Sequence, residues 1–220
     1  MLENLNEIAE GLIQDLTARN QVREEALLSS RKLIRSCANT IRAVHREEKD
    51  AAAAMLAEAR EAALEMKGRL LPYPDLYFAG YTQDAMKEYV EASATYALVY
   101  DEPLPTPQEL GMETVAYLQG LAEAASELRR RILDIIRHDR LQEGERCLDA
   151  MEEIYNVLVT IDFPSALTGG LRRTTDMVRG VLERTRGDFT VAMRQSALQQ
   201  ALREFEERLN ARQPAGDAGA

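Results

Sequence analysis

Two pairs of glutamates in this 220-residue chain have a spacing that lets them act together. Glu88 and Glu91 are three residues apart in the run MKEYVEASATYALVY, and Glu123 and Glu127 are four apart in GLAEAASELRR. Residues three or four apart lie on one face of a helix, so each pair forms a two-carboxylate edge. Both runs are rich in apolar and small residues, which predicts that like charges are carried into a packed core.

Carboxylates that are brought together and partly buried repel one another and lose hydration, which costs several kcal/mol for each unpaired group. A hard cation removes this cost, because Mg²⁺ takes oxygen ligands and keeps several waters. Two such ions can activate a water and stabilise a leaving oxygen in phosphodiester hydrolysis. The sequence therefore predicts a site for Mg²⁺, or for Mn²⁺, whose metal ligands and catalytic residues are Glu88, Glu91, Glu123 and Glu127.

Glutamate pairs of this kind also arise without a shared metal site. With 37 acidic residues, the chain forms such pairs by chance on solvated helix faces, as in the segment EAREAALE. Ferritin-like di-iron bundles carry Glu-x-x-His, which is absent here, so that class is disfavoured. All-α nucleoside-triphosphate pyrophosphohydrolases use ExxE followed by ExxD. The second pair here is ExxxE, so this class stays as a partial match.

Long helices must position the carboxylates, because most of the chain lacks proline and glycine. Helices are expected over 3–47, as one long helix or two joined ones, and over 49–70, 82–100, 107–138, 141–161 and 171–209. The helix over 107–138 has room for a kink near Gly111. Thr106 can cap the helix that follows it. Short connections imply antiparallel neighbours, so we expect an all-α antiparallel bundle of six or seven helices. We expect a single domain over 1–210 and a disordered tail over 211–220.

The net charge of −10 argues, taken alone, against a nucleic-acid partner. However, residues 20–46, 129–140 and 171–186 each carry an excess of Lys and Arg, and such local basic faces are compatible with a selective polyanion site. Two groups of basic residues are candidate RNA-binding surfaces. The first is a stripe about 60° wide on a helical wheel, with a histidine beside it: Arg31, Arg35, Arg42, His45 and Arg46. The second is a row that repeats every seven residues: Arg172, Arg179 and Arg186. The alternative is a solvated face whose arginines pair with the acids of the chain.

Nothing in the sequence indicates a membrane or an oxidising compartment. The chain has no apolar run of the length that spans a bilayer, and its start, MLENLNEIAEGL, lacks a signal-peptide pattern. Cys37 and Cys147 lack a CxxC spacing, which favours reduced core thiols. The expected compartment is the cytoplasm.

The runs EYVEA and YLQGLAEAASELRR resemble motifs of the translin/TRAX family, in particular of its archaeal TRAX-like branch. The resemblance extends to VREEALLSSRKLIRSCANTIRAVHR, YFAGYTQDAMKEYVEA and DFPSALTGGLRRTTDMVRGVLERTRGD, and so covers most of residues 20–190. It implies a translin-like fold and RNA binding inside a closed, hollow homo-oligomer, with an octamer as one arrangement. For TRAX-type subunits it implies Mg²⁺-dependent endoribonuclease activity on duplex or structured RNA.

The family motifs match this chain residue by residue, with one departure among the acids. Glu88 and Glu91 match the glutamates of the first motif, and Glu127 matches that of the second. Glu123 stands where the family motif has Asp, which adds one methylene, and Ser126 replaces a Gly. All four positions remain acidic, so the chain is expected to be catalytic. The alternatives are a non-catalytic, translin-like nucleic-acid-binding oligomer and a purely structural helical adaptor.

Overall fold

The computed structural model describes residues 4–212, and within this range the chain is all-α, without a strand. Six long helices make up the body: α1 (Leu5–His45), α2 (Lys49–Leu70), α4 (Gly80–Tyr100), α6 (Thr114–Arg137), α7 (Gly144–Thr160) and α9 (Leu171–Arg212). The connections contain three single-turn helices and one 3-10 turn: α3 (Pro74–Tyr77), α5 (Pro107–Leu110), α8 (Ser165–Thr168) and η1 (Leu141–Glu143). The predicted all-α bundle is confirmed for these residues. Residues 213–220 of the predicted tail lie outside them.

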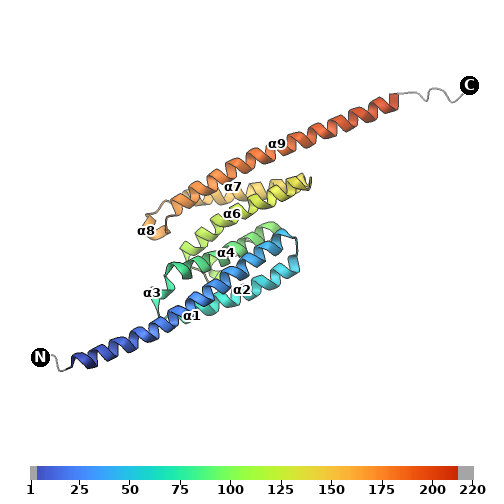
Figure 1. The fold of residues 1–220 in the computed structure, drawn as a ribbon. Coiled ribbons are helices and arrows are strands. Elements are labelled where there is room, and N and C mark those ends of the chain that lie inside the picture. Colours follow the sequence, from blue (N-terminus) through green and yellow to red (C-terminus); the bar gives the residue numbers. More distant parts are fainter. Residues whose placement is uncertain (1–3, 213–220) are drawn as a thin grey trace, which may run out of the picture.

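The long helices form a stack in which α4 and α6 occupy the centre (Figure 1). Helix α1 packs against α2 and α4, and α6 packs against α4, α7 and α9. Short connections produce the expected antiparallel neighbours, such as α1 with α2 and α7 with α9 (Figure 1). The longer connection after α4 carries the chain back, so that α4 and α6 run in the same direction (Figure 1). This pair positions both glutamate motifs.

The core consists of two groups of buried apolar side chains that meet along α4 and α6. One group includes Leu128 and Ile132 of α6 with residues of α7 and α9. The other joins Leu33 of α1 and Met66 of α2 to Tyr89 of α4. Because α4 contributes to both groups, it is largely buried, as the apolar run around EYVEA predicts.

The prediction of a single helix over 107–138 is wrong. Gly111 adopts a φ of 70°, in the left-handed region that favours glycine and ends helices. It separates α5 from α6, so the chain breaks here rather than kinks. The predicted cap is confirmed, because Thr106 and Glu109 form a capping box at the start of α5.

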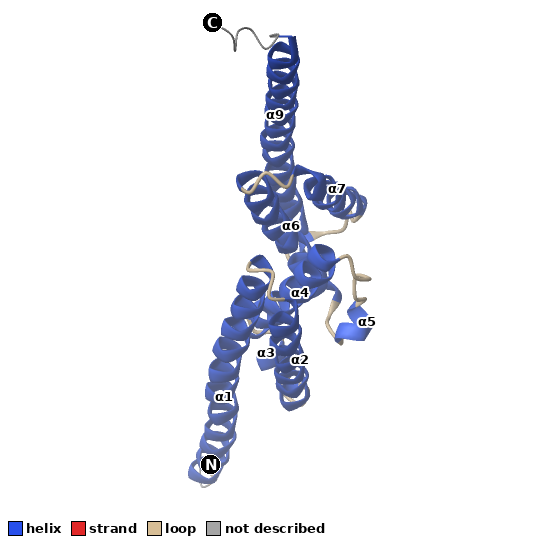
Figure 2. Cartoon of the chain, turned by 90° about the vertical axis from the view of Figure 1, so that its right-hand side faces the viewer, coloured by secondary structure: helices blue, strands red, loops and turns tan. Residues whose placement is uncertain are grey.

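Both ends of the bundle project beyond its body in opposite directions (Figures 1 and 2). The first turns of α1 and the last turns of α9 carry apolar side chains that are about half exposed or more: Leu5, Ile8, Leu12, Ile13 and Leu16, and Val191, Leu198, Leu202, Phe205 and Leu209. The apolar periodicity of the N-terminal segment therefore marks a face that this chain alone does not cover. None of the described helices is both long and apolar enough to cross a membrane. Cys37 and Cys147 are free and buried, as expected.

Candidate functional site

Three of the four predicted carboxylates come together where α4 packs against α6. Glu88 and Glu91 of α4 and Glu123 of α6 each place one carboxylate oxygen within 4.8 Å of the others. We call these three residues the glutamate cluster. The longer side chain at position 123 thus still reaches the cluster.

Gly120 allows the two helices to approach closely enough to form this cluster. A Cβ atom at this position would lie 2.6 Å from the main-chain oxygen of Lys87 and 2.6 Å from Cβ of Val90. Real Cβ atoms do not make such contacts, so a side chain here would push α6 away from α4. Gly120 precedes Glu123 by one turn and therefore sets the distance between the motifs.

Burial places a high electrostatic cost on the cluster. Glu91 is only 8% exposed. Its burial, followed by the negative charges of Glu123, Glu88 and Glu127, raises its pKa to about 8. Burial also raises the pKa of Glu88, although the charge of Lys87 opposes this rise. Without a further cation, Glu91 therefore holds its proton near neutral pH.

Lys87 lies within the cluster, a position that the sequence pattern alone did not predict. Its Nζ atom is 2.7 Å from Oε1 of Glu123 and 3.7 Å from Oε1 of Glu88. Burial alone would lower the pKa of Lys87. The hydrogen bond to Glu123 and the charges of Glu123, Glu88 and Asp84 outweigh this effect and raise it. The available sequence signal was its place on α4, directly before Glu88 and four residues before Glu91.

The fourth predicted ligand, Glu127, lies beside the cluster and is engaged by His45. A hydrogen bond of 2.5 Å joins Oε2 of Glu127 to Nε2 of His45 at the end of α1, and this bond lowers the pKa of Glu127. The His45 side chain is 4% exposed, and its Nδ1 atom has no partner among the described residues. The structure thus turns His45 inward, away from the arginine stripe beside which the sequence places it.

The donor set of the cluster fits a hard divalent cation. Its ligand atoms are carboxylate oxygens, the type that Mg²⁺ and Mn²⁺ prefer. Lys87 brings one positive charge to three carboxylates, so it does not neutralise them when all are ionised. The cluster could therefore hold a metal ion.

The α1 arginine row consists of Arg31, Arg35, Arg42 and Arg46, which are all exposed. Arg42 donates a hydrogen bond of 2.8 Å to Asn39, and Arg46 forms an ion pair of 2.7 Å with Glu48. Within residues 4–212, the side chains of Arg31 and Arg35 make no hydrogen bond or ion pair. The row therefore presents two free guanidinium groups to solvent.

The α9 arginine row, Arg172, Arg179 and Arg186, is also exposed, but each member already has an acidic partner. The ion pairs are Arg172 with Asp162 at 2.8 Å, Arg179 with Glu183 at 2.9 Å, and Arg186 with Glu152. These contacts favour the alternative for this row, in which its arginines pair with acids of the same chain. Helices α4 and α6 separate this row from α1 (Figure 1).

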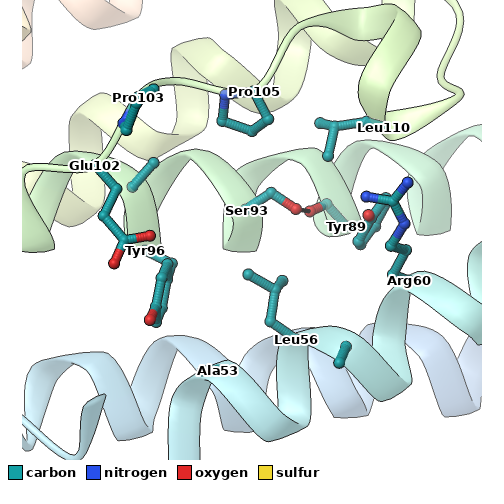
Figure 3. A pocket seen from close by; sticks show the side chains of 12 residues that line it. Ala53, Leu56, Arg60, Tyr89, Ser93, Tyr96, Glu102, Pro103, Pro105 and Leu110 are labelled. Carbon is teal, nitrogen blue, oxygen red and sulfur yellow. Dashed lines mark hydrogen bonds between the residues drawn. The ribbon is translucent and has the colours of Figure 1, made fainter. Parts of the chain in front are cut away.

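Two cavities flank α4. A cavity of about 470 Å³ adjoins the glutamate cluster and is lined by Lys87 and Glu123, with the exposed ring of Phe78 at its edge. A second cavity, of about 400 Å³, lies on another face of α4, between α2 and the connection after Tyr100 (Figure 3). Arg60 and Glu102 stand at its opposite ends (Figure 3). It shares no lining residue with the cluster, whereas the first cavity is lined by Glu123 itself.

Comparisons with known proteins identify relatives of this chain. No protein-family model matches it. It is 34% identical over 197 residues to the uncharacterized protein MJ0175 of Methanocaldococcus jannaschii, an alignment that covers 89% of this chain and 87% of that protein.

Among solved structures, a complex of AfC3PO with duplex RNA is 33% identical to this chain, with a TM-score of 0.78 over 84% of this chain and 96% of that one. The crystal structure of AfC3PO is 31% identical, with a TM-score of 0.75 and the same coverage. Apo-NeC3PO is 23% identical, with a TM-score of 0.76 over 87% and 98% of the two chains, and shows the shared fold. Together with the two glutamate motifs on α4 and α6, these similarities show that the chain belongs to the translin/TRAX-like family.

Proposed function

We propose that this chain is a Mg²⁺-dependent endoribonuclease that binds duplex or structured RNA inside a hollow homo-oligomer. The observation that carries the proposal is the glutamate cluster, whose three carboxylates converge within 4.8 Å. The similarity to AfC3PO, whose structure contains duplex RNA, supports RNA as the substrate.

In this proposal Glu88, Glu91 and Glu123 hold a divalent ion, Mg²⁺ or Mn²⁺. When bound, the ion supplies a Lewis acid that activates water and stabilises the leaving oxygen of a phosphodiester. Glu91 releases its proton to become a ligand. Glu127 stays ionised because His45 donates to it, and it can accept a hydrogen bond from a water beside the cluster. The chain thereby orients the attacking water through Glu127.

The α1 arginine row is the proposed RNA contact. Arg31 and Arg35 are exposed and free to donate to phosphate oxygens, for which the planar guanidinium group is well suited. The row runs along α1 toward His45, which contacts Glu127 beside the cluster. The α9 row is proposed as a weaker contact, because its arginines must first leave their acidic partners.

The exposed apolar faces at the projecting ends support a homo-oligomer. Apolar side chains in repeated register on a helix that extends from the body indicate an interface rather than a solvated surface. Copies of one chain related by closed symmetry bury such faces without leaving a free end. A closed shell, such as an octamer, is the arrangement we propose.

A non-catalytic, RNA-binding oligomer is the second candidate, and one observation favours it. Lys87 already donates to Glu123, so part of the charge that would attract a metal ion is neutralised. This candidate predicts salt-sensitive RNA binding without metal-dependent cleavage.

Incubation of the purified oligomer with labelled RNA and with free nucleoside triphosphates, in Mg²⁺ or in EDTA, separates the candidates. The endoribonuclease cleaves RNA only with Mg²⁺, and loses cleavage in Glu88→Gln but not in the matched control Glu58→Gln on the exposed face of α2. RNA binding without cleavage would favour the second candidate. Release of pyrophosphate from nucleotides would indicate a pyrophosphohydrolase.

A further inference from the structure

The glutamate cluster contains a cation of its own. The Lys87 side chain is only 21% exposed, and its ammonium group contacts Glu123 at 2.7 Å and Glu88 at 3.7 Å. It extends from the same helix as Glu88 and Glu91, so it cannot leave the site without a change of rotamer. An ion bound by the cluster while Lys87 keeps this rotamer shares the carboxylates with this lysine.

Two of the carboxylate oxygens that a second metal ion could use are already engaged. Oε1 of Glu123 accepts the hydrogen bond from Lys87. Oε2 of Glu127, the nearest further carboxylate, is bound to His45 at 2.5 Å. The remaining oxygens of Glu88, Glu91 and Glu123 suffice for one ion together with waters, as Mg²⁺ sites commonly require.

The charges of the site also favour a single divalent ion. The three carboxylates of the cluster, when ionised, balance one divalent ion together with one ammonium group, and Glu127 beside them adds one further negative charge. Two divalent ions beside the same ammonium group would leave an excess of positive charge in a partly buried place, where like charges are costly.

We propose that the cluster of this chain binds one divalent ion per subunit, and that Lys87 supplies the positive charge that a second ion would otherwise bring. The inference rests on the proposed metal site and names its ion content. Replacing Lys87 by a neutral side chain should open a second ion position, and should tighten binding of the first ion on the order of tenfold or more, because a like charge is removed from contact distance.

Counting of Mn²⁺ ions tests the inference without reference to cleavage. Mn²⁺ is titrated alone into the intact oligomer, and bound ions are measured by electron paramagnetic resonance and by calorimetry. The double variant Glu88→Gln, Glu91→Gln defines ions bound elsewhere on the acidic chain. Lys87→Met removes the charge at similar length, Lys87→Gln provides a second neutral variant, and Lys87→Arg retains the charge.

Lys67→Met is the matched control, because Lys67 is similarly buried and pairs with Glu113 at 3.0 Å outside the cluster. We expect one cluster-bound Mn²⁺ per chain in the wild type, in Lys87→Arg and in Lys67→Met, and two in the neutral Lys87 variants. Two cluster-bound ions in the wild type would overturn the inference about Lys87 and leave the proposed metal site intact. The same holds if both neutral variants bind the same number of Mn²⁺ ions as the wild type with the same affinity. If the wild type binds no more Mn²⁺ than the double glutamine variant, the proposed metal site fails and the inference fails with it.

Discussion

The substitution Glu91→Gln isolates the electrostatic cost of the glutamate cluster. Glutamine keeps nearly the same shape but cannot ionise. Burial, followed by the charges of Glu123, Glu88 and Glu127, raises the pKa of Glu91 from 4.5 to about 8. The folded chain therefore binds this proton more tightly than the unfolded chain does.

This difference fixes the direction of the pH dependence. Between pH 4.5 and 8 the folded state holds more protons at this position than the unfolded state, so the stability of the metal-free wild type falls as the pH rises through this window. A tenfold change in proton affinity corresponds to about 1.4 kcal/mol, so the full cost above pH 8 is about 5 kcal/mol. For a chain of this length that corresponds to roughly 10–20 °C in melting temperature.

Thermal melting of the wild type and of Glu91→Gln in EDTA, from pH 5 to pH 9, measures this effect. We expect the variant to melt at a higher temperature than the wild type at pH 9, and the difference to shrink toward pH 5. Glu58→Gln, on an exposed part of α2, should follow the wild type. Addition of Mg²⁺ should raise the melting temperature of the wild type more than that of Glu91→Gln, because only the wild type offers all three carboxylates. Equal pH slopes for the wild type and Glu91→Gln would refute the assignment of a buried, charged cluster.

Three further predictions concern RNA contact, helix spacing and assembly. Replacing both Arg31 and Arg35 by Ala should weaken RNA binding at every sequence tested and reduce the slope of log affinity against log salt by about 1 to 2. Filter binding over a salt series measures this slope, and an unchanged slope excludes these arginines as phosphate contacts. Gly120→Ala should destabilise the fold by about 1–3 kcal/mol and abolish metal-dependent cleavage, since its Cβ would meet α4 at 2.6 Å. The control is Gly187→Ala, where an added Cβ would have no neighbouring atom within 4 Å, and this variant should melt at or above the wild-type temperature. If Gly120→Ala and Gly187→Ala unfold alike, the close approach of α4 and α6 is contradicted. Leu202→Glu on the projecting end of α9 should reduce the assembly size measured by light scattering, whereas a wild-type chain that elutes as a 24.7 kDa monomer would exclude the closed shell.

The carboxylates could be found from the sequence because their spacing is local. Three- and four-residue intervals place side chains on one helix face whatever the tertiary fold, so Glu88 and Glu91 could be paired without a structure. The apolar character of the surrounding run likewise predicts burial of α4. That Glu123 converges with this pair followed only from the hypothesis of a shared metal site and from the family resemblance.

The partners of these groups could not be predicted, because they depend on the register between helices far apart in the chain. In the sequence Lys87 looks like an ordinary helix residue, and only the packing of α6 places Glu123 against it. The alignment of α6 with α4 depends in turn on the absence of a side chain at Gly120. His45 belongs to a basic stripe on the wheel, but the last turn of α1 directs it to Glu127. Periodicity also identifies the apolar face of the first turns of α1, but it does not show that the face lies beyond the body of the bundle.

Metal-dependent cleavage of RNA by the intact oligomer tests the central claim most directly. A labelled RNA duplex with unpaired ends is incubated with the wild type and with Glu88→Gln, in Mg²⁺ and in EDTA, while binding of the same RNA is measured in parallel. We predict cleavage by the wild type only in Mg²⁺, and loss of cleavage in Glu88→Gln with RNA binding retained. Mg²⁺-dependent cleavage by Glu88→Gln at the wild-type rate, or tight binding without cleavage by the wild type, would contradict a catalytic role for the glutamate cluster.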